Sequence, residues 1–279
     1  MPELPEVETI KKELERVVLG KKITEVCVHH PKVIREPSVE KFKKGLTGVT
    51  IRNILRKAKV LILELSSGKS LVIHLKMTGQ LVLRQRTAKD FKTKKRALRG
   101  KNARVSFYLS DGNWLDFNDQ RLFAELRLLD DWRSLKFIQG LGPEPFAMDI
   151  GQFKEMLVKK KTKIKPLLLD QTFICGIGNL YAAEVLFRAR VHPERPASSL
   201  SDKEKGLLFK EIKDTLTEAI FHKGSSVDQY VQVSGQRGDY VKYHKVYDRK
   251  DKPCLVCKTP IQRTALGGRG TYFCPKCQR

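Results

Sequence analysis

The strongest constraint on the fold lies near the C-terminus, where four cysteines form two Cys-x-x-Cys pairs separated by sixteen residues. Four thiolates at this spacing can surround one Zn²⁺ tetrahedrally on two adjacent backbone turns joined by a β-hairpin. Two disulfides or redox pairs fit less well, because the chain has no secretory pattern and should remain in a reducing compartment. The sequence therefore predicts one structural zinc ion bound by Cys254, Cys257, Cys274 and Cys277.

The predicted hairpin ends in a glycine-rich tip, residues 266–270, that presents Arg269. A guanidinium on such a tip suits a phosphate contact, although an isolated surface charge would have the same sequence. The remaining cysteines, Cys27 and Cys175, lie among apolar residues. We expect both to be core residues rather than nucleophiles.

The charge balance points to a polyanionic partner. The chain of 279 residues carries 55 Lys and Arg against 31 Asp and Glu, a net charge of +24. Nucleic acid is the favoured partner over an anionic membrane surface or a merely basic background. No apolar run approaches the roughly 20 residues of a membrane span, and the first residues lack the pattern of a signal peptide. We therefore expect a cytoplasmic protein, and a monomer.

The first half of the chain reads as a helix followed by strands. A helix with Pro5 at its first position and Gly20 as its stop is predicted by apolar residues at helical spacing. From residue 23 to about 129 the pattern changes to short β-rich runs, at 60–65, 70–75, 104–109 and 122–128. This pattern predicts an antiparallel β-sandwich or flattened barrel.

Helical patterns dominate after the break at Gly142-Pro143-Glu144-Pro145, at residues 153–160, 164–170, 179–189 and after Ser201. Ser201 and Glu204 form a capping box for the last helix, which Gly224 ends. Residues 225–242 show no period and are expected to form a long functional loop. The fold class is therefore α+β, with domains at residues 1–135, 136–242 and 243–279.

Two basic features could contact a DNA backbone. Residues 84–104 hold ten Lys or Arg residues against one Asp, which suits either a solvated hairpin loop or a DNA-facing segment. The turn Gly176-Ile177-Gly178-Asn179 precedes a helix, and backbone N–H groups there could bind a phosphate, although a plain helix–helix turn would look the same. Lysines 159–161, Lys163 and Lys165 lie just upstream and favour the phosphate contact.

The N-terminus offers a nucleophile. Removal of Met1 would leave Pro2 with a free secondary amine, which titrates near pH ~8 and is partly neutral at pH 7. Attack of a secondary amine on a sugar C1′ yields an iminium that can act as an electron sink. Glu3 and Glu6 stand beside it and could supply a general acid. Without further information, the same residues are an ordinary helix start with acidic first-turn side chains.

Together these motifs resemble the formamidopyrimidine-DNA glycosylase family, relatives of endonuclease VIII, over nearly the whole chain. The resemblance is carried by residues 2–9, Lys59, residues 74–79, 142–145 and 177–181, and the zinc hairpin with Arg269. It implies an N-terminal β-sandwich with its helix, a helix-two-turn-helix domain and a β-hairpin zinc finger. It also implies that damaged double-stranded DNA is held in the cleft between these domains.

The resemblance implies a base-excision-repair enzyme that flips and excises oxidised purines and then cleaves the strand by β,δ-elimination. It makes Pro2 the Schiff-base nucleophile and Glu3 the acid, with Glu6 in support. It further implies catalytic or phosphate-binding roles for Lys59, His74, Asn179 and Arg269. Met77, Arg121 and Phe123 match residues that fill the vacated stack, and Tyr240 falls in a lid loop, while Lys163 adds a DNA contact from its basic neighbourhood.

The chain departs from the family pattern in two places. Asn102 and Arg104 replace a usual pair of histidines, and Gln120 and Ala124 alter the segment around Phe123, where a glycine is usual at residue 124. These changes put lesion preference in doubt. An endonuclease VIII-like specificity for oxidised pyrimidines and a catalytically silent damaged-DNA-binding protein are the alternatives.

Overall fold

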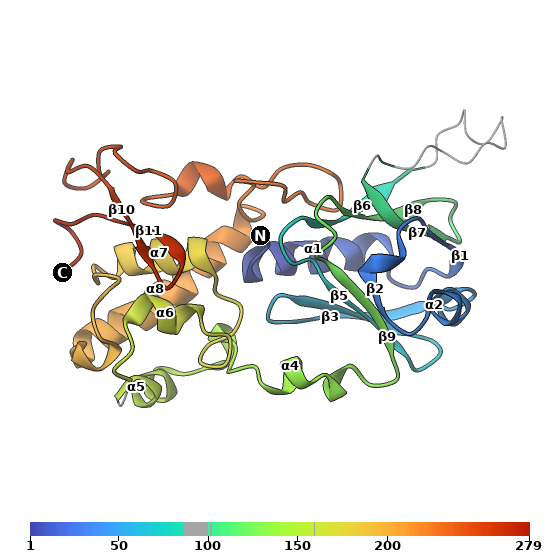
Figure 1. Cartoon of the computed structure of the whole chain (residues 1–279), viewed down its shortest axis with the longest axis horizontal. Helices are drawn as coiled ribbons and strands as arrows, with labels where there is room; N and C mark the ends of the chain where they lie inside the picture. Colours follow the sequence, from blue (N-terminus) through green and yellow to red (C-terminus); the bar gives the residue numbers. More distant parts are fainter. Residues whose placement is uncertain (86–99, 101, 159) are drawn as a thin grey trace. The chain divides into compact units, whose positions relative to one another are not determined.

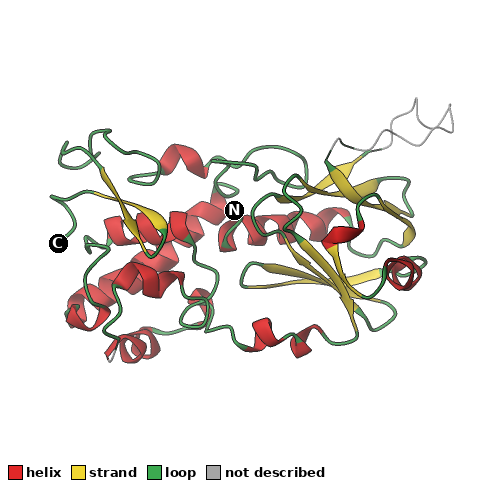
Figure 2. Cartoon of the chain, viewed as in Figure 1, coloured by secondary structure: helices red, strands yellow, loops and turns green. Residues whose placement is uncertain are grey.

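The computed structural model describes residues 1–85, 100, 102–158 and 160–279 (Figure 1). Most of the basic segment 84–104, and Lys159 of the lysine run, lie outside these residues. The chain forms two compact units, Met1–Ile138 with Lys223–Asp239, and Gln139–His222 with Tyr240–Arg279. Strands dominate the first unit and helices the second (Figure 2).

The first unit is a β-sandwich with a long N-terminal helix. One sheet has the strand order β1-β7-β8-β6 and the other β2-β9-β5-β4-β3. The elements are α1 (Leu4–Val17), β1 (Ile23–Val28), β2 (Ile34–Glu36), α2 (Val39–Leu46), β3 (Ile51–Lys57), β4 (Val60–Leu65), β5 (Ser70–His74), β6 (Gly79–Arg84), β7 (Ala103–Leu109), β8 (Trp114–Asp119) and β9 (Glu125–Leu129), followed by η2 (Trp132–Ser134) and α4 (Lys136–Gln139).

One core joins the two sheets. Alternate side chains of β4, such as Leu61 and Leu63, share a cluster with Phe117 of β8 and Ile10 of α1. The intervening residues of β4, Val60 and Ile62, face a second, smaller cluster on the other side of the sheet. Because strand side chains alternate between faces, β4 is apolar on both. This arrangement holds α1, and with it the N-terminus, against β3 and β4.

The second unit packs helices and a zinc hairpin together. Its elements are η3 (Pro145–Ala147), α5 (Ile150–Val158), α6 (Ile164–Leu169), α7 (Asn179–Arg188), η4 (Ala197–Ser199), α8 (Asp202–Phe221), η5 (Tyr240–Tyr243), β10 (Gln262–Leu266) and β11 (Arg269–Phe273). Helix α7 contacts α6, α8 and β11 and is the centre of the unit. The capping box predicted for α8 is confirmed, since Ser201 N donates to Glu204 Oε2 at 2.8 Å and Glu204 N donates to Ser201 Oγ at 3.3 Å. None of the helices in the described part of the chain is long and apolar enough to cross a membrane.

Several local expectations differ from the structure. The β-rich region contains the helix α2, and β2 pairs with β9 in parallel rather than antiparallel fashion. Pro5 is the second residue of α1, whose first residue is Leu4. Cys175 is buried as expected, but Cys27 is only partly buried, with Sγ 3.3 Å from Glu25 Oε1.

The compact units also divide the chain differently from the expected 1–135, 136–242 and 243–279. The zinc hairpin shares a unit with the helices, because Ala183 and Phe187 of α7 pack against Cys254 and Cys274. Residues Lys223–Asp239 belong to the first unit, where the Val233 side chain enters the core. These long-range contacts are invisible to a division based on local composition.

Candidate active site and zinc centre

The N-terminus is built into the start of α1. Pro2 is buried, and Glu3 is the N-cap residue with only 5% of its surface exposed. Glu3 N donates to Glu6 Oε2 at 2.8 Å, so the first turn of the helix holds the backbone beside Pro2. A capping interaction of this kind satisfies N–H groups that a helix start would otherwise leave without partners. The predicted catalytic cluster of Pro2, Glu3 and Glu6 therefore forms one local, ordered structure.

Glu6 also anchors the segment Lys223–Asp239. Its second oxygen, Oε1, accepts a hydrogen bond from Ser225 N at 2.8 Å, and the side chain is 2% exposed. Gly224 makes this approach possible: its φ is +74°, and a Cβ there would lie 2.8 Å from Glu6 Oε1. Further along, Val233 N donates to Glu13 Oε2 at 2.7 Å. The acidic face of α1 thus carries the loop, and Glu6 is a positioning residue rather than a free acid.

Lys59 and His74 lie at the same end of two paired strands. The register pairs Val60 of β4 with His74 of β5, and Lys59 precedes Val60. Ala58 has a φ of +51° in the turn before it, and Arg56 steadies that turn by donating from Nη1 to Ala58 O at 2.9 Å. The β4–β5 ladder therefore brings together two residues that the sequence predicts as phosphate ligands.

The imidazole of His74 is held neutral. Burial first, and then the charges of Lys76 and Lys59, lower the pKa of His74 to about 4, against the opposing effect of Glu125. Lys76 N donates to His74 Nδ1 at 3.1 Å, which assigns the proton to Nε2. A neutral imidazole with an Nε2–H can donate to a phosphate oxygen without a change of protonation near pH 7.

The predicted stack-filling residues project from two adjacent loops. Met77 is 39% exposed and Phe123 is 45% exposed, so neither is a core residue. The guanidinium carbon of Arg121 lies 4.7 Å from the centroid of the Phe123 ring. These two exposed apolar side chains, one of them beside a cation, are therefore available for contact with another molecule.

Asp119, which sequence reasoning missed, organises both loops. It is fully buried, and its Oδ2 accepts from Ala124 N at 2.8 Å while its Oδ1 accepts from Arg121 N at 3.2 Å. Thr78, next to Met77, also hydrogen-bonds to Oδ1. One carboxylate therefore ties the Met77 loop to the loop of Arg121 and Phe123. The available signal was an acidic residue at the end of β8, two residues before Arg121.

Replacement of Asp119 by Asn is expected to lower the free energy of unfolding by about 2 kcal/mol. The amide N–H₂ of Asn would take the place of one carboxylate oxygen and could not accept the hydrogen bond that this oxygen receives from a backbone N–H. Thermal or urea unfolding measures this loss. The exposed Asp130→Asn, whose side chain is 89% exposed, is the control and should stay within about 0.5 kcal/mol of the parent. Equal stability of the two variants would contradict the organising role of Asp119.

The departures from the family pattern act on this same aspartate. Arg104 Nε donates to Asp119 O at 2.6 Å, and Asp119 N donates to Asn102 O at 3.1 Å. Ala124 is fully buried and is not among the residues with positive φ, so this position does not require glycine here. Gly79 leaves room for its methyl group, since a Cβ on Gly79 would lie 2.9 Å from Ala124 Cβ. None of the altered residues has a positive φ, whereas Leu122 in the same loop has a φ of +58°.

In the second unit, a buried lysine joins the helix–helix turn to the zinc hairpin. Lys165 Nζ donates to Asn179 Oδ1 at 2.6 Å and to Thr271 Oγ1 at 2.8 Å. Asn179 Nδ2 in turn donates to Gly270 O at 3.0 Å, beside Arg269. Asn179 and Arg269, predicted separately as phosphate ligands, are thus brought together by these bonds.

The two lysines of this segment have different surroundings from those expected. Lys165 is fully buried and cannot be one of the surface lysines that face a DNA backbone. Lys163 is 48% exposed on its side chain and forms an ion pair with Glu194. The position of Lys165 between Ile164 and Pro166, at the start of an apolar run, was the signal that its side chain points inward.

A Lys165→Met variant is expected to lose about 1–3 kcal/mol of stability, because Asn179 Oδ1 and Thr271 Oγ1 would be left without their buried donor. Lys163→Met is the matched control and should change stability by less than about 1 kcal/mol, as its ion pair is exposed. Thermal unfolding of both variants measures the difference. If they melt together, Lys165 does not hold the turn to the hairpin.

Tyr240 is placed differently from the expected lid. It begins η5 in the second unit and is fully buried, outside the segment Lys223–Asp239. Its ring lies 5.7 Å from that of Tyr181, and Arg188 Nη2 lies 3.4 Å from its hydroxyl. Burial is the main cause that raises the pKa of Tyr240. The side chain therefore packs inside this unit.

The four zinc cysteines form a compact cluster. Their Sγ atoms all lie within 4.8 Å of one another, with Cys254 and Cys277 at 3.9 Å and Cys257 and Cys274 at 3.4 Å. A tetrahedron with Zn–S bonds of about 2.3 Å has S–S edges of about 3.8 Å, so the cluster fits zinc. Val256 N lies 3.5 Å from Cys254 Sγ, an N–H donor to the thiolate.

The electrostatics of the cluster are also consistent with a bound cation. Burial and the neighbouring thiols raise the pKa of Cys277 to about 12. Four thiolates can therefore be ionised together only when a bound metal compensates their charge. Both the geometry and the chemistry of the four sulfurs thus fit the one structural zinc ion that the sequence predicts.

Three family models match consecutive parts of the chain: the formamidopyrimidine-DNA glycosylase N-terminal domain at residues 1–126, the corresponding H2TH domain at 141–231, and the zinc finger found in FPG and IleRS at 251–279. The zinc-finger match and the cysteine cluster together confirm the prediction of one structural zinc ion. The chain is 41% identical to the formamidopyrimidine-DNA glycosylase of Pelotomaculum thermopropionicum, over 100% of this chain and 99% of that protein. It is 39% identical to that of Bacillus cereus with the same coverage.

Solved structures of members of the same family have a similar fold. The structure of a Lactococcus lactis FPG mutant with a Fapy-dG containing DNA has a TM-score of 0.89 and 35% identity, covering 100% of both chains. The complex between Lactococcus lactis Fpg and an abasic site containing DNA has the same TM-score and identity, covering 99% of both. The α+β fold and the resemblance stated from the motifs are confirmed. This chain therefore belongs to the formamidopyrimidine-DNA glycosylase family of bifunctional DNA glycosylases and AP lyases.

Proposed function

We propose that this protein excises oxidised purines, such as 8-oxoguanine and formamidopyrimidines, from double-stranded DNA and then cleaves the strand through a Schiff base at Pro2. The observation that carries the proposal is the ordered N-terminus, in which Pro2 is buried beside Glu3 and Glu6 fixes both the first turn and the loop at Ser225. The substrate class is supported by the relatives whose names and complexes mention formamidopyrimidine lesions.

The chemistry begins when removal of Met1 frees the Pro2 nitrogen. This amine attacks C1′ of an extruded nucleotide, and the bond from C1′ to the base breaks. The base leaves with the bonding electrons and takes up the proton that the attacking nitrogen releases. Glu3 protonates the ring oxygen O4′, so the sugar opens to an iminium. Loss of a C2′ proton expels the 3′ phosphate, a second elimination expels the 5′ phosphate, and water hydrolyses the iminium to restore the amine.

The remaining predicted residues would hold the DNA during these steps. Lys59, the neutral His74, Asn179 and Arg269 supply donors for phosphate oxygens, and Lys163 adds a nearby charge. Met77, Arg121 and Phe123 would occupy the space left by the extruded base and offset the lost stacking. Tyr240 is fully buried and would not contact DNA itself; it would support the neighbouring residues of its unit by packing against them. We expect the protein to work as a cytoplasmic monomer on damaged duplexes.

Borohydride trapping tests the mechanism. The protein is incubated with a duplex carrying 8-oxoguanine opposite cytosine, borohydride is added, and a covalent protein–DNA adduct is expected at Pro2 by peptide mapping. A duplex with an oxidised pyrimidine tests the endonuclease VIII-like alternative in parallel and should react more slowly. Absence of an adduct with the 8-oxoguanine duplex and with an abasic duplex would exclude the Schiff base and leave a silent DNA-binding protein.

A further inference from the structure

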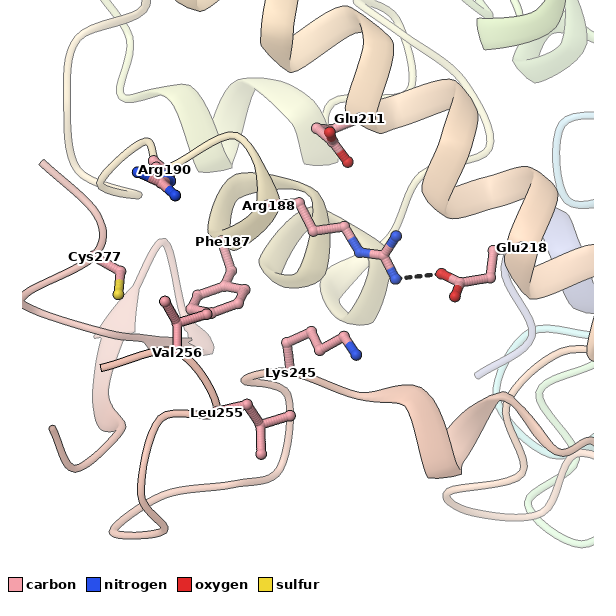
Figure 3. A pocket seen from close by; sticks show the side chains of 9 residues that line it. All are labelled: Phe187, Arg188, Arg190, Glu211, Glu218, Lys245, Leu255, Val256 and Cys277. Carbon is pink, nitrogen blue, oxygen red and sulfur yellow. Dashed lines mark hydrogen bonds and ion pairs between the residues drawn. The ribbon is translucent and has the colours of Figure 1, made fainter. Parts of the chain in front are cut away.

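The second unit contains a pocket that none of the residues discussed as DNA ligands lines. Its volume is about 450 Å³, and it lies among the C-terminal end of α7, the facing side of α8, residue 245 and the first zinc knuckle (Figure 3). This volume is within the ~300–1,000 Å³ range of ligand-binding pockets. A pocket of this size can hold one or two side chains of another molecule.

One side of the pocket is apolar and held in place by the zinc site. Phe187, Leu255 and Val256 all line this side, and Leu255 and Val256 are 48% and 65% exposed (Figure 3). These two aliphatic residues stand between Cys254 and Cys257, so the zinc knuckle fixes their backbone. The chain has a net charge of +24, so an exposed pair of aliphatic side chains on a rigid turn stands out from its charged surface. Exposure of such a pair to water is unfavourable, which suits a contact surface.

The other side of the pocket is lined by charged side chains, of which more are basic than acidic. Arg188 pairs with Glu218, and Glu211 Oε1 lies 3.9 Å from Lys210 Nζ. Arg190 and Lys245 also line the pocket, and among the described residues neither forms an ion pair. Two cations without acidic partners therefore flank the apolar side.

The pocket is at the far end of α7 from the proposed phosphate ligands. Asn179 is the first residue of the helix and Arg188 the last, which separates them by about 13 Å along the helix axis at ~1.5 Å per residue. Asn179 and Lys165 face Gly270 and Thr271 of the hairpin, none of which lines the pocket. The pocket is thus a separate site within this unit.

We propose that this pocket docks an acidic segment of a partner protein, with an apolar side chain against Phe187 and carboxylates paired with Arg190 and Lys245. The apolar side formed by Phe187, Leu255 and Val256 disfavours a DNA backbone, since DNA-binding surfaces are polar and strongly positive. Apolar anchors surrounded by charged rims are characteristic of protein–protein contacts. The site would let the enzyme bind a partner while its proposed DNA ligands remain available.

An array of short peptides tests the proposal. The central pair of positions carries every combination of apolar residues, the flanks carry Asp, and two matched arrays replace the flanks with Lys or the central pair with Ser. Binding of fluorescently labelled peptides to the intact, zinc-loaded protein is measured by anisotropy, and the methyl resonances of Leu255 and Val256 are followed by NMR. Acidic peptides with an apolar centre should bind and shift these methyl groups.

Three variants identify the site. Lys245→Glu should weaken peptide binding by about tenfold or more, and Leu255→Ser by about fivefold. Lys203→Glu, an exposed charge reversal that does not line the pocket, should stay within about twofold of the parent. Cleavage of a damaged duplex should be unchanged in all three. The proposal is overturned if no acidic peptide binds below about 1 mM, if the Lys array binds equally well, or if an undamaged duplex competes for the same methyl groups.

Discussion

A protein that retains Met1 is expected to lose strand cleavage by at least about 10⁴-fold, while it binds an abasic-site duplex within about twofold of the protein that begins at Pro2. With Met1 in place, the Pro2 nitrogen is part of an amide, and its lone pair is delocalised into the carbonyl. Removal of Met1 converts it into an amine with a pKa near ~8, which is partly unprotonated at neutral pH. Nucleophilicity therefore depends on a single peptide bond.

The comparison uses two preparations that differ only in Met1, each confirmed by mass spectrometry. Single-turnover cleavage of a duplex with 8-oxoguanine reports the chemical step, and anisotropy with an uncleavable abasic analogue reports DNA binding. Met1 is 47% exposed, so its presence should not disturb the core, and equal melting temperatures provide the control. Cleavage at the same rate by both preparations would rule out Pro2 as the nucleophile.

Loss of the zinc site is expected to weaken DNA binding and to leave the chemical step of bound DNA unchanged. In Cys274→Ser, the hairpin should lose its metal, and DNA affinity should fall by roughly 10²-fold or more, because structural zinc contributes about 10 kcal/mol or more to the folding of such small modules. Arg269 and Asn179 depend on the hairpin, since Asn179 Nδ2 donates to Gly270 O. Each charge-assisted hydrogen bond to DNA that the variant can no longer form weakens binding by about 1.5–3 kcal/mol.

Cys27→Ser is the matched control, because Cys27 is a partly buried thiol outside the metal cluster. It should retain one zinc per chain by metal analysis and bind DNA like the parent. At DNA concentrations high enough to saturate Cys274→Ser, the borohydride-trapping rate of the bound fraction should approach that of the parent. A variant that bound normally but failed to form the adduct would show that the hairpin acts on chemistry rather than on binding.

These two results would separate chemistry from DNA binding. Pro2, Glu3 and Glu6 belong to one turn of helix and its cap, whereas Asn179 and the hairpin belong to a different compact unit. A change confined to the first group should alter rates at saturating DNA, and a change in the second should alter the concentration of DNA required. The buried Lys165 is a positioning residue of the second group.

Much of the protein was predictable from short-range patterns. The spacing of Cys254, Cys257, Cys274 and Cys277 predicted a four-sulfur zinc site, and the capping box of Ser201 and Glu204 marked the start of α8. Both signals depend on a few residues close together in the chain, where backbone geometry limits the possible structures. The family motifs were recognisable for the same reason.

Tertiary structure alone decided what distant segments do to each other. Lys165 looked like one of several surface lysines until packing buried it against Asn179 and Thr271. Asp119 became the organiser of two loops only because β6 and β8 pair at its position. The loop at Val233 joined the first unit through Glu13, and Tyr240 turned inward in the second. Local sequence determines helix ends and ligand spacing, but burial and partner choice depend on contacts between residues far apart in the chain, which no local pattern contains.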